Sequence, residues 1–305
     1  MKNIKILTDA LTQWDKRYRS FGDYSVTTLL NPPRMVQLNK RHKNDVVRTP
    51  EQQIAAFIGS GVHLMFEESL KLQAVLEPEY SVERTVYDKI EDRLITGKFD
   101  ILWNERHLYD VKTARCWKKV FDPDMVEWHE QLNIYALMLH NRGLDIRSIN
   151  IIACYLDWDQ KRSFRNEDYP QTRVVEYQLS LWPWEDTDKF LRSRINLMKE
   201  AENLNDEHLP FCTDEEMWVR NKEIEYAIMA SKDAGRALRV CSTLDEAKQY
   251  AAEKTTSLKP GAFIEVRKPI RKRCEDWCDA APWCQQFKEY AAKKESGNYW
   301  EKVTL

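Results

Sequence analysis

The stretch that decides the fold is ITGKFDILWNERHLYDVKTA, residues 95–114. Apolar and polar residues alternate on both sides of a short polar turn at 104–106, which predicts two antiparallel strands. The first strand carries Asp100, and the second carries Asp110 and Lys112. Because side chains alternate between the two faces of a strand, Asp110 and Lys112 point the same way. The turn brings Asp100 beside Asp110.

Two neighbouring carboxylates with a lysine predict a particular chemistry. The carboxylates repel each other unless a cation sits between them, and Mg²⁺ or Mn²⁺ prefers such oxygen ligands. A metal-bound water is more acidic than bulk water and can attack phosphorus. Lys112 could position that water or stabilise charge on the phosphate. The pattern therefore suits metal-assisted phosphodiester hydrolysis, with a surface ion pair on a strand as the alternative.

A long helix is predicted before these strands, over residues 50–76. Thr49 and Gln52 fit a capping box, and Pro50 suits the first turn. Apolar residues recur along it at helical spacing. His63 lies on this helix and could supply a nitrogen ligand to the same metal, although a lone helix histidine is more often structural or solvated.

A second helix is predicted after the strands, over residues 123–141 with Pro123 near its start. Gln131 and Tyr135 are four residues apart and therefore share one face. An amide and a hydroxyl on one ridge could hold a DNA backbone against the metal. Ordinary helix surface and core is the alternative interpretation, and it suits Tyr135 well.

The remaining pattern divides the chain into two domains. A helix is predicted at 3–19, a buried strand in INIIACYLDW (149–158), a further strand in RVVEYQLS (173–180) and a helix at 184–203. From about 205 the chain becomes loop-rich, and a small β-β-α-β unit follows at 225–268. We therefore expect a core domain over 1–204 and a small α+β domain over 205–305.

Charge and hydropathy limit the class of protein. The net charge is −2 and the pI is about 6.4, so a nucleic-acid surface must be a local patch. The chain has no apolar run long enough to span a membrane, and its N-terminus is too charged for a signal peptide. We expect a cytoplasmic protein, in which reducing conditions keep the seven cysteines free or metal-bound.

Three cysteines are concentrated in CEDWCDAAPWC, where Cys274, Cys278 and Cys284 follow a C-x3-C-x5-C pattern. Thiolates at this density usually hold a metal or a cluster, and such sites normally need four ligands. Three reduced structural cysteines are the alternative. Of the others, Cys116 lies in the basic stretch ARCWKK and is expected to be exposed or close to DNA. Cys154 and Cys241 lie on predicted strands and are expected in the core.

Three basic clusters stand out in this nearly neutral chain. Their proximity to the proposed metal sites favours phosphate contacts over an ordinary solvated surface. The residues expected to bind DNA are Lys40, Arg41, Arg115, Lys118, Lys119, Arg271, Lys272 and Arg273. Trp117, Trp277 and Trp283 lie among them and could stack bases of a single strand, or could pack beside the cysteines.

In order, these motifs read H…D…DxK…QxxxY, and that order resembles the RecB-like, lambda-exonuclease-type branch of the PD-(D/E)XK nuclease superfamily. The resemblance covers about residues 25 to 200. It implies an α/β fold, with a mixed central sheet flanked by helices. It also implies that His63, Asp100, Asp110 and the carbonyl of Val111 bind Mg²⁺ or Mn²⁺, that Lys112 is the catalytic lysine, and that Gln131 and Tyr135 contact substrate. Glu67 or Glu68 could assist.

Several nucleases of this kind carry a C-terminal cysteine triad that holds a [4Fe–4S] cluster. Their fourth cysteine precedes the histidine and is followed by Pro-Arg, whereas residues 1–62 of this chain contain no cysteine and 31–34 read NPPR. Cys212, in a loop that opens the small domain, is the expected fourth ligand. Phage members of the family share the TTLL-x-PPR and LPxC-TxEE-xW stretches of this chain. We expect [4Fe–4S], with Zn²⁺ as the alternative.

The resemblance implies a metal-dependent deoxyribonuclease, expected to act as an exonuclease on DNA ends in phage or bacterial recombination, repair or genome processing. Its partners would be DNA and a recombination or helicase protein, and the oligomeric state is open. One rival is a non-catalytic DNA-binding or assembly protein that retains the fold. The other is an accessory nuclease of RNA-guided immunity, for which the N-terminal cysteine would be expected.

Overall fold

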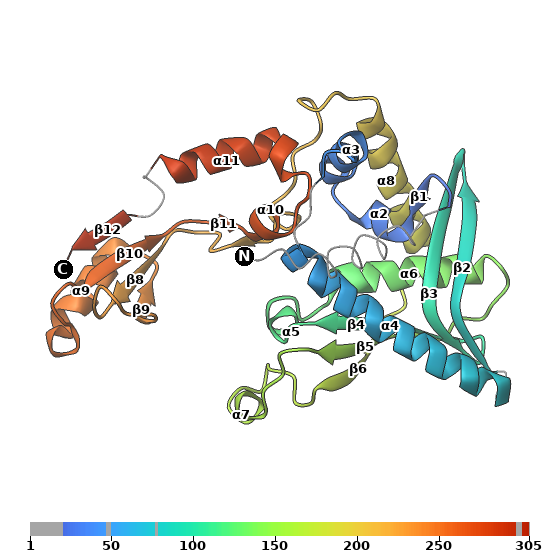
Figure 1. Cartoon of the computed structure of the whole chain (residues 1–305), viewed down its shortest axis with the longest axis horizontal. Helices are drawn as coiled ribbons and strands as arrows, with labels where there is room; N and C mark the ends of the chain where they lie inside the picture. The colour runs from blue at the N-terminus through green and yellow to red at the C-terminus, as the bar shows by residue number, and fades with distance from the viewer. Residues whose placement is uncertain (1–20, 47–49, 77–78, 297–300, 305) are drawn as a thin grey trace. The chain divides into compact units, whose positions relative to one another are not determined.

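The computed structural model describes residues 21–46, 50–76, 79–296 and 301–304 of the 305-residue chain. It divides into two compact units (Figure 1). The first takes its described residues from 1–31 and 47–200, and the second from 32–46 and 201–305. The predicted boundary at 204/205 is thus close to the observed one at 200/201. The segment 32–46, however, was expected in the first domain and belongs to the second unit.

Helix α3 (Pro33–Arg41) explains this difference. Its Leu38 is buried in an apolar cluster with Leu209 and Cys284. The guanidinium of Arg34, itself buried, donates to the backbone carbonyls of Leu209 and Pro210. A charged side chain is buried only where its donors find acceptors, so these contacts fix the segment in the second unit.

A mixed six-stranded sheet forms the centre of the first unit. Its strands are β1 (Tyr24–Ser25), β2 (Tyr80–Ile90), β3 (Arg93–Trp103), β4 (His107–Ala114), β5 (Ser148–Tyr155) and β6 (Val174–Leu179). The order is β1-β3-β4-β5-β6, with β2 paired along β3. The β2–β3–β4 meander is antiparallel as predicted, β4 and β5 run parallel, and β6 returns antiparallel.

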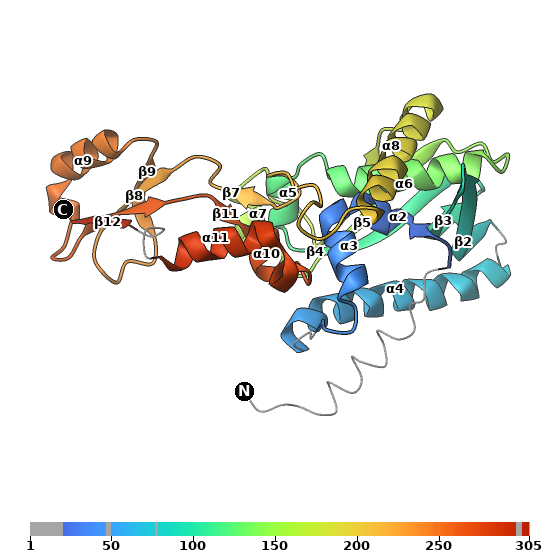
Figure 2. The ribbon, with the colours of Figure 1, turned by 90° about the horizontal axis from the view of Figure 1, so that it is seen from above.

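Helices cover both sides of this sheet. Figure 2 shows α4 (Pro50–Leu76) on one side, and α6 (Val126–His140) and α8 (Trp184–Glu202) on the other. The short helices are α2 (Val26–Leu30), α5 (Trp117–Phe121) and α7 (Gln160–Ser163). The first unit is therefore a mixed α/β domain with a mixed central sheet flanked by helices.

The helix boundaries largely follow the predictions. Helix α6 starts three residues later than expected, because Met125 takes a left-handed conformation, with φ of 51°, just before it. Ser25 caps α2 by accepting from the backbone N–H of Thr28 at 3.0 Å. The predicted helix at 3–19 and the capping box of Thr49 with Gln52 lie outside the described residues.

The second unit holds the predicted β-β-α-β arrangement. Strands β8 (Glu225–Met229), β9 (Ala237–Cys241), β10 (Phe263–Arg267) and β12 (Glu301–Thr304) form a sheet in the order β12-β10-β8-β9, and α9 (Leu244–Glu253) packs on it. Strand β7 (Val219–Arg220) pairs with β11 (Ile270–Arg271). A 3-10 turn, η1 (Thr255–Ser257), connects α9 to β10. After β11 the chain forms α10 (Lys272–Asp276), the 3-10 turn η2 (Ala281–Trp283) and α11 (Gln285–Glu295).

Within the described part of the chain, no helix combines the length and the apolar composition needed to cross a bilayer.

Candidate active site

The site lies where β3 and β4 separate. The two strands pair only from Ile101 with Tyr109 to Trp103 with His107, next to the turn. One residue beyond this pairing, an Asp100 carboxylate oxygen accepts the backbone N–H of Val111 at 2.7 Å. Both Asp100 and Asp110 are buried. As predicted, the turn brings the two carboxylates to neighbouring positions.

Helix α4 adds His63 to this pair. Its Nδ1 lies 3.3 Å from Oδ2 of Asp100. The hydrogen bond with Asp100 raises the pKa of His63 above its ordinary value, and partial burial opposes that rise. The imidazole is thus held against a carboxylate by a proton that a metal ion would replace, because metal ligands must be deprotonated.

Lys112 is held from two sides. Its ammonium lies 2.7 Å from Oδ2 of Asp110 and donates to Oε1 of Gln131 at 2.9 Å. The Gln131 amide in turn donates to the Tyr135 hydroxyl at 3.0 Å. Burial raises the pKa of Tyr135, so its phenol stays neutral. We name this chain of hydrogen bonds, which runs from Tyr135 and Gln131 of α6 to Lys112 of β4, the relay.

This relay corrects one expectation. Tyr135 is only 3% exposed, so it does not reach a bound strand. Its ring lies over Gly97 of β3, where an added Cβ would come within 2.4 Å of the ring. Tyr135 is therefore a positioning residue, and Gln131, which is half-buried, is the member of the pair that can face solvent.

Burial also raises the pKa of Asp110, to about 6, although Lys112 opposes the rise. The Oδ2 atom of Asp110 is paired with the ammonium of Lys112 at 2.7 Å, and this contact opposes the effect of burial on the pKa. A buried carboxylate needs a cation or hydrogen-bond donor to compensate its charge. Lys112 compensates it in the metal-free protein, and a carboxylate held in this way can also serve as a metal ligand.

Glu83 is a member of the site that the sequence did not reveal. Val82 pairs with Ile101 and Arg84 with Phe99, so Glu83 lies opposite Asp100. Its backbone takes φ of 53°, which is unusual within a strand, and its carboxylate forms an ion pair with Lys98. Burial raises the pKa of Glu83, and the nearby Asp100 adds to the rise.

One nitrogen and two carboxylate oxygens from His63, Glu83 and Asp100 lie within 4.8 Å of one another. Oxygen ligands with one imidazole suit Mg²⁺ and Mn²⁺, so the donor set fits the predicted ion. Asp110 and the Val111 carbonyl remain predicted ligands. The sequence does not choose between Glu67 and Glu68 as the glutamate that assists the site. Glu67 lies on the side of the site, where its charge contributes to the raised pKa of Glu83. The Glu68 side chain, in contrast, is 65% exposed.

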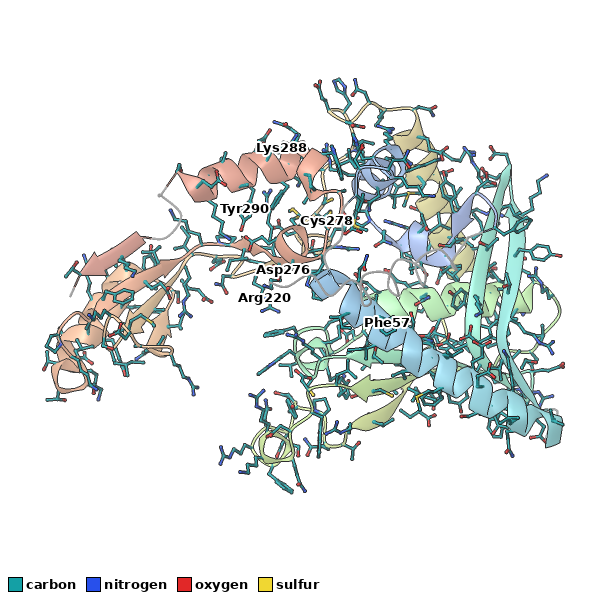
Figure 3. All side chains as sticks on the ribbon, viewed as in Figure 1. Phe57, Arg220, Asp276, Cys278, Lys288 and Tyr290 are labelled. Atoms are coloured by element: carbon teal, nitrogen blue, oxygen red, sulfur yellow. The ribbon has the colours of Figure 1, made fainter. Side chains whose placement is uncertain are left out.

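In the second unit, the four cysteines expected to bind a metal or cluster are neighbours, namely Cys212, Cys274, Cys278 and Cys284. Cys212 has its pKa raised to about 12, by burial and by the neighbouring Glu216 and three other thiols. Burial and the other thiols likewise raise the pKa of Cys274 to about 11. Cys278, labelled in Figure 3, lies between α10 and η2. The four thiols are thus near enough to influence one another's pKa, and their binding of a metal or cluster stays a prediction.

Cys212 is fixed to α11 by Gln286. The Gln286 side chain accepts from the backbone N–H of Cys212 and donates to its carbonyl, both at 2.9 Å. Cys278, Trp283 and Phe287 pack with Cys284 in one apolar cluster, and Trp283 stacks on His42 at 4.6 Å. Trp283 is thus a packing residue beside the cysteines, the second of its two predicted roles.

The other cysteines separate in a way that corrects one prediction. Cys241 is buried in the core of the small sheet, and Cys154 is partly buried on β5. Cys116, expected at the surface, is fully buried, and its backbone N–H donates to Asp157 at 2.7 Å. Tyr169 and Asp157 surround the thiol, and burial raises the pKa of Cys116. Of its basic neighbours, Arg115 is exposed, whereas Lys118 and Lys119 are partly buried.

Most of the predicted DNA-binding residues already contact the protein. Each of the following side chains has a partner within its own unit. Arg41 contacts Asp206 and the carbonyls of Ala201 and Leu204. Lys118 contacts Asp122, and Lys119 contacts the Pro123 carbonyl. Arg271 contacts the Gln286 carbonyl, Lys272 contacts Asp276, and Arg273 contacts the Glu216 carbonyl. Lys40 makes only a long, exposed pair with Glu202, and Arg115 is exposed.

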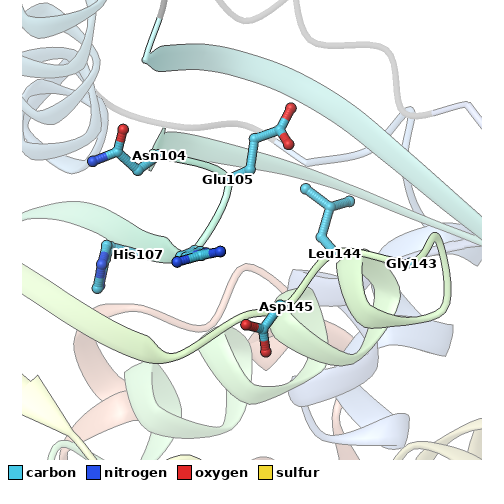
Figure 4. A pocket seen from close by; sticks show the side chains of 7 residues that line it. Asn104, Glu105, His107, Gly143, Leu144 and Asp145 are labelled. Carbon is cyan, nitrogen blue, oxygen red and sulfur yellow. The ribbon is translucent and has the colours of Figure 1, made fainter.

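A surface hollow of about 480 Å³ lies at the other end of β4 from Lys112. Figure 4 shows its lining by the β3–β4 turn and the loop after α6, namely 104–107 and 143–145. It is polar and open, and none of the predicted site residues lines it.

Comparison with known proteins adds little information about this site. No protein-family model matches the chain, and no curated protein matches it. Among solved structures, one described as "Crystal structure of SSO0001" is similar, with a TM-score of 0.44 and 17% identity over 63% of this chain and 85% of that chain. The site is therefore judged on its own residues.

Proposed function

We propose that this protein is a metal-dependent DNA nuclease of the PD-(D/E)XK type that degrades DNA from its ends. The observation that carries the proposal is the convergence of His63, Asp100, Asp110, Lys112 and Gln131 at the point where β3 and β4 separate. These five residues come from four elements spread over about 70 positions, and a surface ion pair would not require them to meet.

The residues have separable tasks under this proposal. His63, Glu83 and Asp100 hold a divalent cation, with Asp110 and the Val111 carbonyl as further ligands. When bound, Mg²⁺ or Mn²⁺ lowers the pKa of water and stabilises charge on a phosphate. Lys112 presents an ammonium group beside Asp110, where it can stabilise a charged phosphate oxygen. Gln131 and Tyr135 keep that ammonium in place.

The four cysteines supply a second metal site, for which we propose [4Fe–4S] over Zn²⁺. The preference follows from the resemblance, in which a C-terminal cysteine triad of this kind holds a [4Fe–4S] cluster. A single Zn²⁺ with four thiolates is the alternative. The role of the site here is to tie the loop at Cys212 to α10 and α11.

The proposed function is tested with end-labelled linear DNA and covalently closed circles, each single- and double-stranded. The protein is purified anaerobically and assayed with Mn²⁺. Lys112→Ala is compared with Lys161→Ala, which removes an exposed lysine of α7 remote from the site. We expect the wild type and Lys161→Ala to degrade linear DNA and to leave circles intact, and Lys112→Ala to be inactive.

Two outcomes would reject the proposal in different ways. Cleavage of circles would make the protein an endonuclease, so the end-dependence would fail while the chemistry stood. DNA binding without cleavage, equal in the wild type and Lys112→Ala, would favour the non-catalytic DNA-binding or assembly protein.

A further inference from the structure

Helix α4 is apolar on two sides. The side toward the sheet carries His63, Phe66 and Leu70, all partly buried. The outer side also carries large apolar residues, although it faces away from the sheet (Figure 2). A helix normally exposes one polar side, so a second apolar side that faces away from the sheet indicates a surface that a partner covers.

The exposed residues follow a regular spacing. Steps of four and three residues separate each member of what we name the outer stripe from the next, which is the spacing of a coiled-coil seam. The outer stripe comprises Ile54, Ile58, Gly61, Met65, Glu68, Leu72 and Val75. Exposure of its apolar side chains increases along the helix, from 36% at Ile54 and 43% at Ile58 to 72% at Met65, 74% at Leu72 and 82% at Val75.

The outer stripe is complementary to itself when reversed. Met65 is at its middle, so an antiparallel copy sets Ile58 opposite Leu72 and Gly61 opposite Glu68. Among the described residues, none comes within 4 Å of the position that a Cβ on Gly61 would take. Gly61 thus leaves a hole between its neighbours on the outer stripe into which a longer side chain can insert, as coiled-coil knobs do.

Charge selects the antiparallel orientation. The charged side chains described on this helix, Glu67, Glu68 and Lys71, all lie in its second half. An antiparallel copy places them against uncharged residues around Gly61. A parallel copy would instead set Glu68 against Glu68 within the seam, where like charges disfavour pairing.

We propose that the outer stripe of α4 is a homodimer interface that packs against the same stripe of a second copy in antiparallel orientation. Such an interface is isologous, as in most two-fold dimers. The stripe is about 32 Å long at 1.5 Å per residue, which places the contact at the small end of stable interfaces and predicts a micromolar dissociation constant. His63 lies on the opposite side of the helix, so pairing leaves each candidate active site uncovered by this contact.

The interface is tested on the full chain by sedimentation equilibrium over roughly 1–200 µM, a range set by the expected affinity. Met65→Glu and Leu72→Glu each bury two charges at the proposed seam, and we expect the dimer dissociation constant to rise on the order of 100-fold. Phe164→Glu is the matched control, because Phe164 is 81% exposed on another element. It should leave the dimer unchanged.

Orientation is tested by exchanging charges. Ile58→Glu and Leu72→Lys should each weaken the dimer, and the double variant should restore it, because antiparallel pairing sets residue 58 against residue 72 of the copy. Circular dichroism verifies that each variant is folded. A wild type that stays monomeric would overturn the proposal, as would a dimer that survives Met65→Glu and Leu72→Glu. Failure of the double variant to restore pairing would overturn the antiparallel arrangement.

Discussion

Glu83 of β2 lies directly opposite Asp100 of β3, and its backbone takes the left-handed conformation at that position. Together with His63 of α4, the two carboxylates form a group of ligand atoms within 4.8 Å. Non-glycine residues in this conformation are strained, persist only where surrounding interactions stabilise them, and concentrate at functional sites. A bound divalent cation would offset this strain by binding both carboxylates.

Glu83→Gln should therefore weaken metal binding. An amide oxygen keeps the size of the side chain but supplies no negative charge, so we expect the Mn²⁺ affinity to fall on the order of 10-fold or more. Isothermal titration of the metal-free protein with Mn²⁺ measures this. Glu68→Gln is the control, since it removes the same charge from the exposed side of α4. Equal affinities for both variants would show that Glu83 is not a ligand.

Local patterns predicted the strands and helices that carry the site, because alternation and helical spacing are properties of neighbouring residues. The meander at 80–114, α4 and the Asp110–Lys112 pair follow from such patterns. Glu83 did not, since nothing local distinguishes it from other polar strand residues. Counting the register back from the turn after Ile90 would have found it opposite Asp100.

Burial of single side chains was harder to predict than the elements themselves. Cys116 follows a strand among basic residues, yet Tyr169 and Asp157 from a distant loop enclose it. Similarly, proximity in sequence predicts residues 33–41 in the first domain, whereas Leu38 of α3 packs with Leu209 and Cys284. These outcomes depend on contacts between segments far apart in the chain, which a single sequence does not display.

Gly97→Ala should disturb both the fold and the relay. The added Cβ would come within 2.4 Å of the Tyr135 ring, which has no room to move because Gln131 and the core hold it. Overpacking of this kind costs about 1–3 kcal/mol in the free energy of unfolding. Urea denaturation measures the change. At Gly235, where no described atom lies within 4 Å of the added Cβ, the same substitution should be nearly neutral.

Tyr135→Phe should slow cleavage without weakening DNA binding. Loss of the hydroxyl removes the acceptor for Gln131 and leaves Lys112 less well oriented, so we expect about a 10-fold lower single-turnover rate and a loss of about 1 kcal/mol in stability. Tyr155→Phe is the matched control, because Tyr155 is also buried and its hydroxyl bonds to Tyr177 at 3.0 Å, outside the site. It should cost similar stability and leave the rate unchanged.

Stability of the metal-free protein should depend on Asp110 between about pH 4 and 7. Burial raises the pKa of Asp110 from 3.8 to about 6, so the folded state binds a proton that the unfolded chain releases in this range. The free energy of unfolding therefore falls as the pH rises. Asp110→Asn removes this contribution. The free energy of unfolding of the wild type, measured relative to that of the variant, should therefore fall by about 1–3 kcal/mol from pH 4 to pH 7.

Urea denaturation in EDTA at the two pH values tests this. Saturating Mn²⁺ should reverse the trend above pH 6 in the wild type alone, because the metal binds the deprotonated carboxylate. If wild type and Asp110→Asn differ in the free energy of unfolding by the same amount at both pH values, the pH dependence does not come from Asp110.

Cys212→Ser should empty the cysteine site of the second unit. Burial and the neighbouring thiols hold the pKa of Cys212 near 12, so the thiolate form at neutral pH depends on a bound metal, and a serine hydroxyl is a far poorer ligand. Iron, acid-labile sulfide and zinc are measured per chain in anaerobically purified protein. We expect iron and sulfide in the wild type and their loss in Cys212→Ser. Cys154→Ser, on β5 of the first unit, should keep both. If the wild type contains one zinc ion per chain and no sulfide, the site holds a single Zn²⁺ and not a cluster. If Cys212→Ser binds as much metal as the wild type, another residue is the fourth ligand.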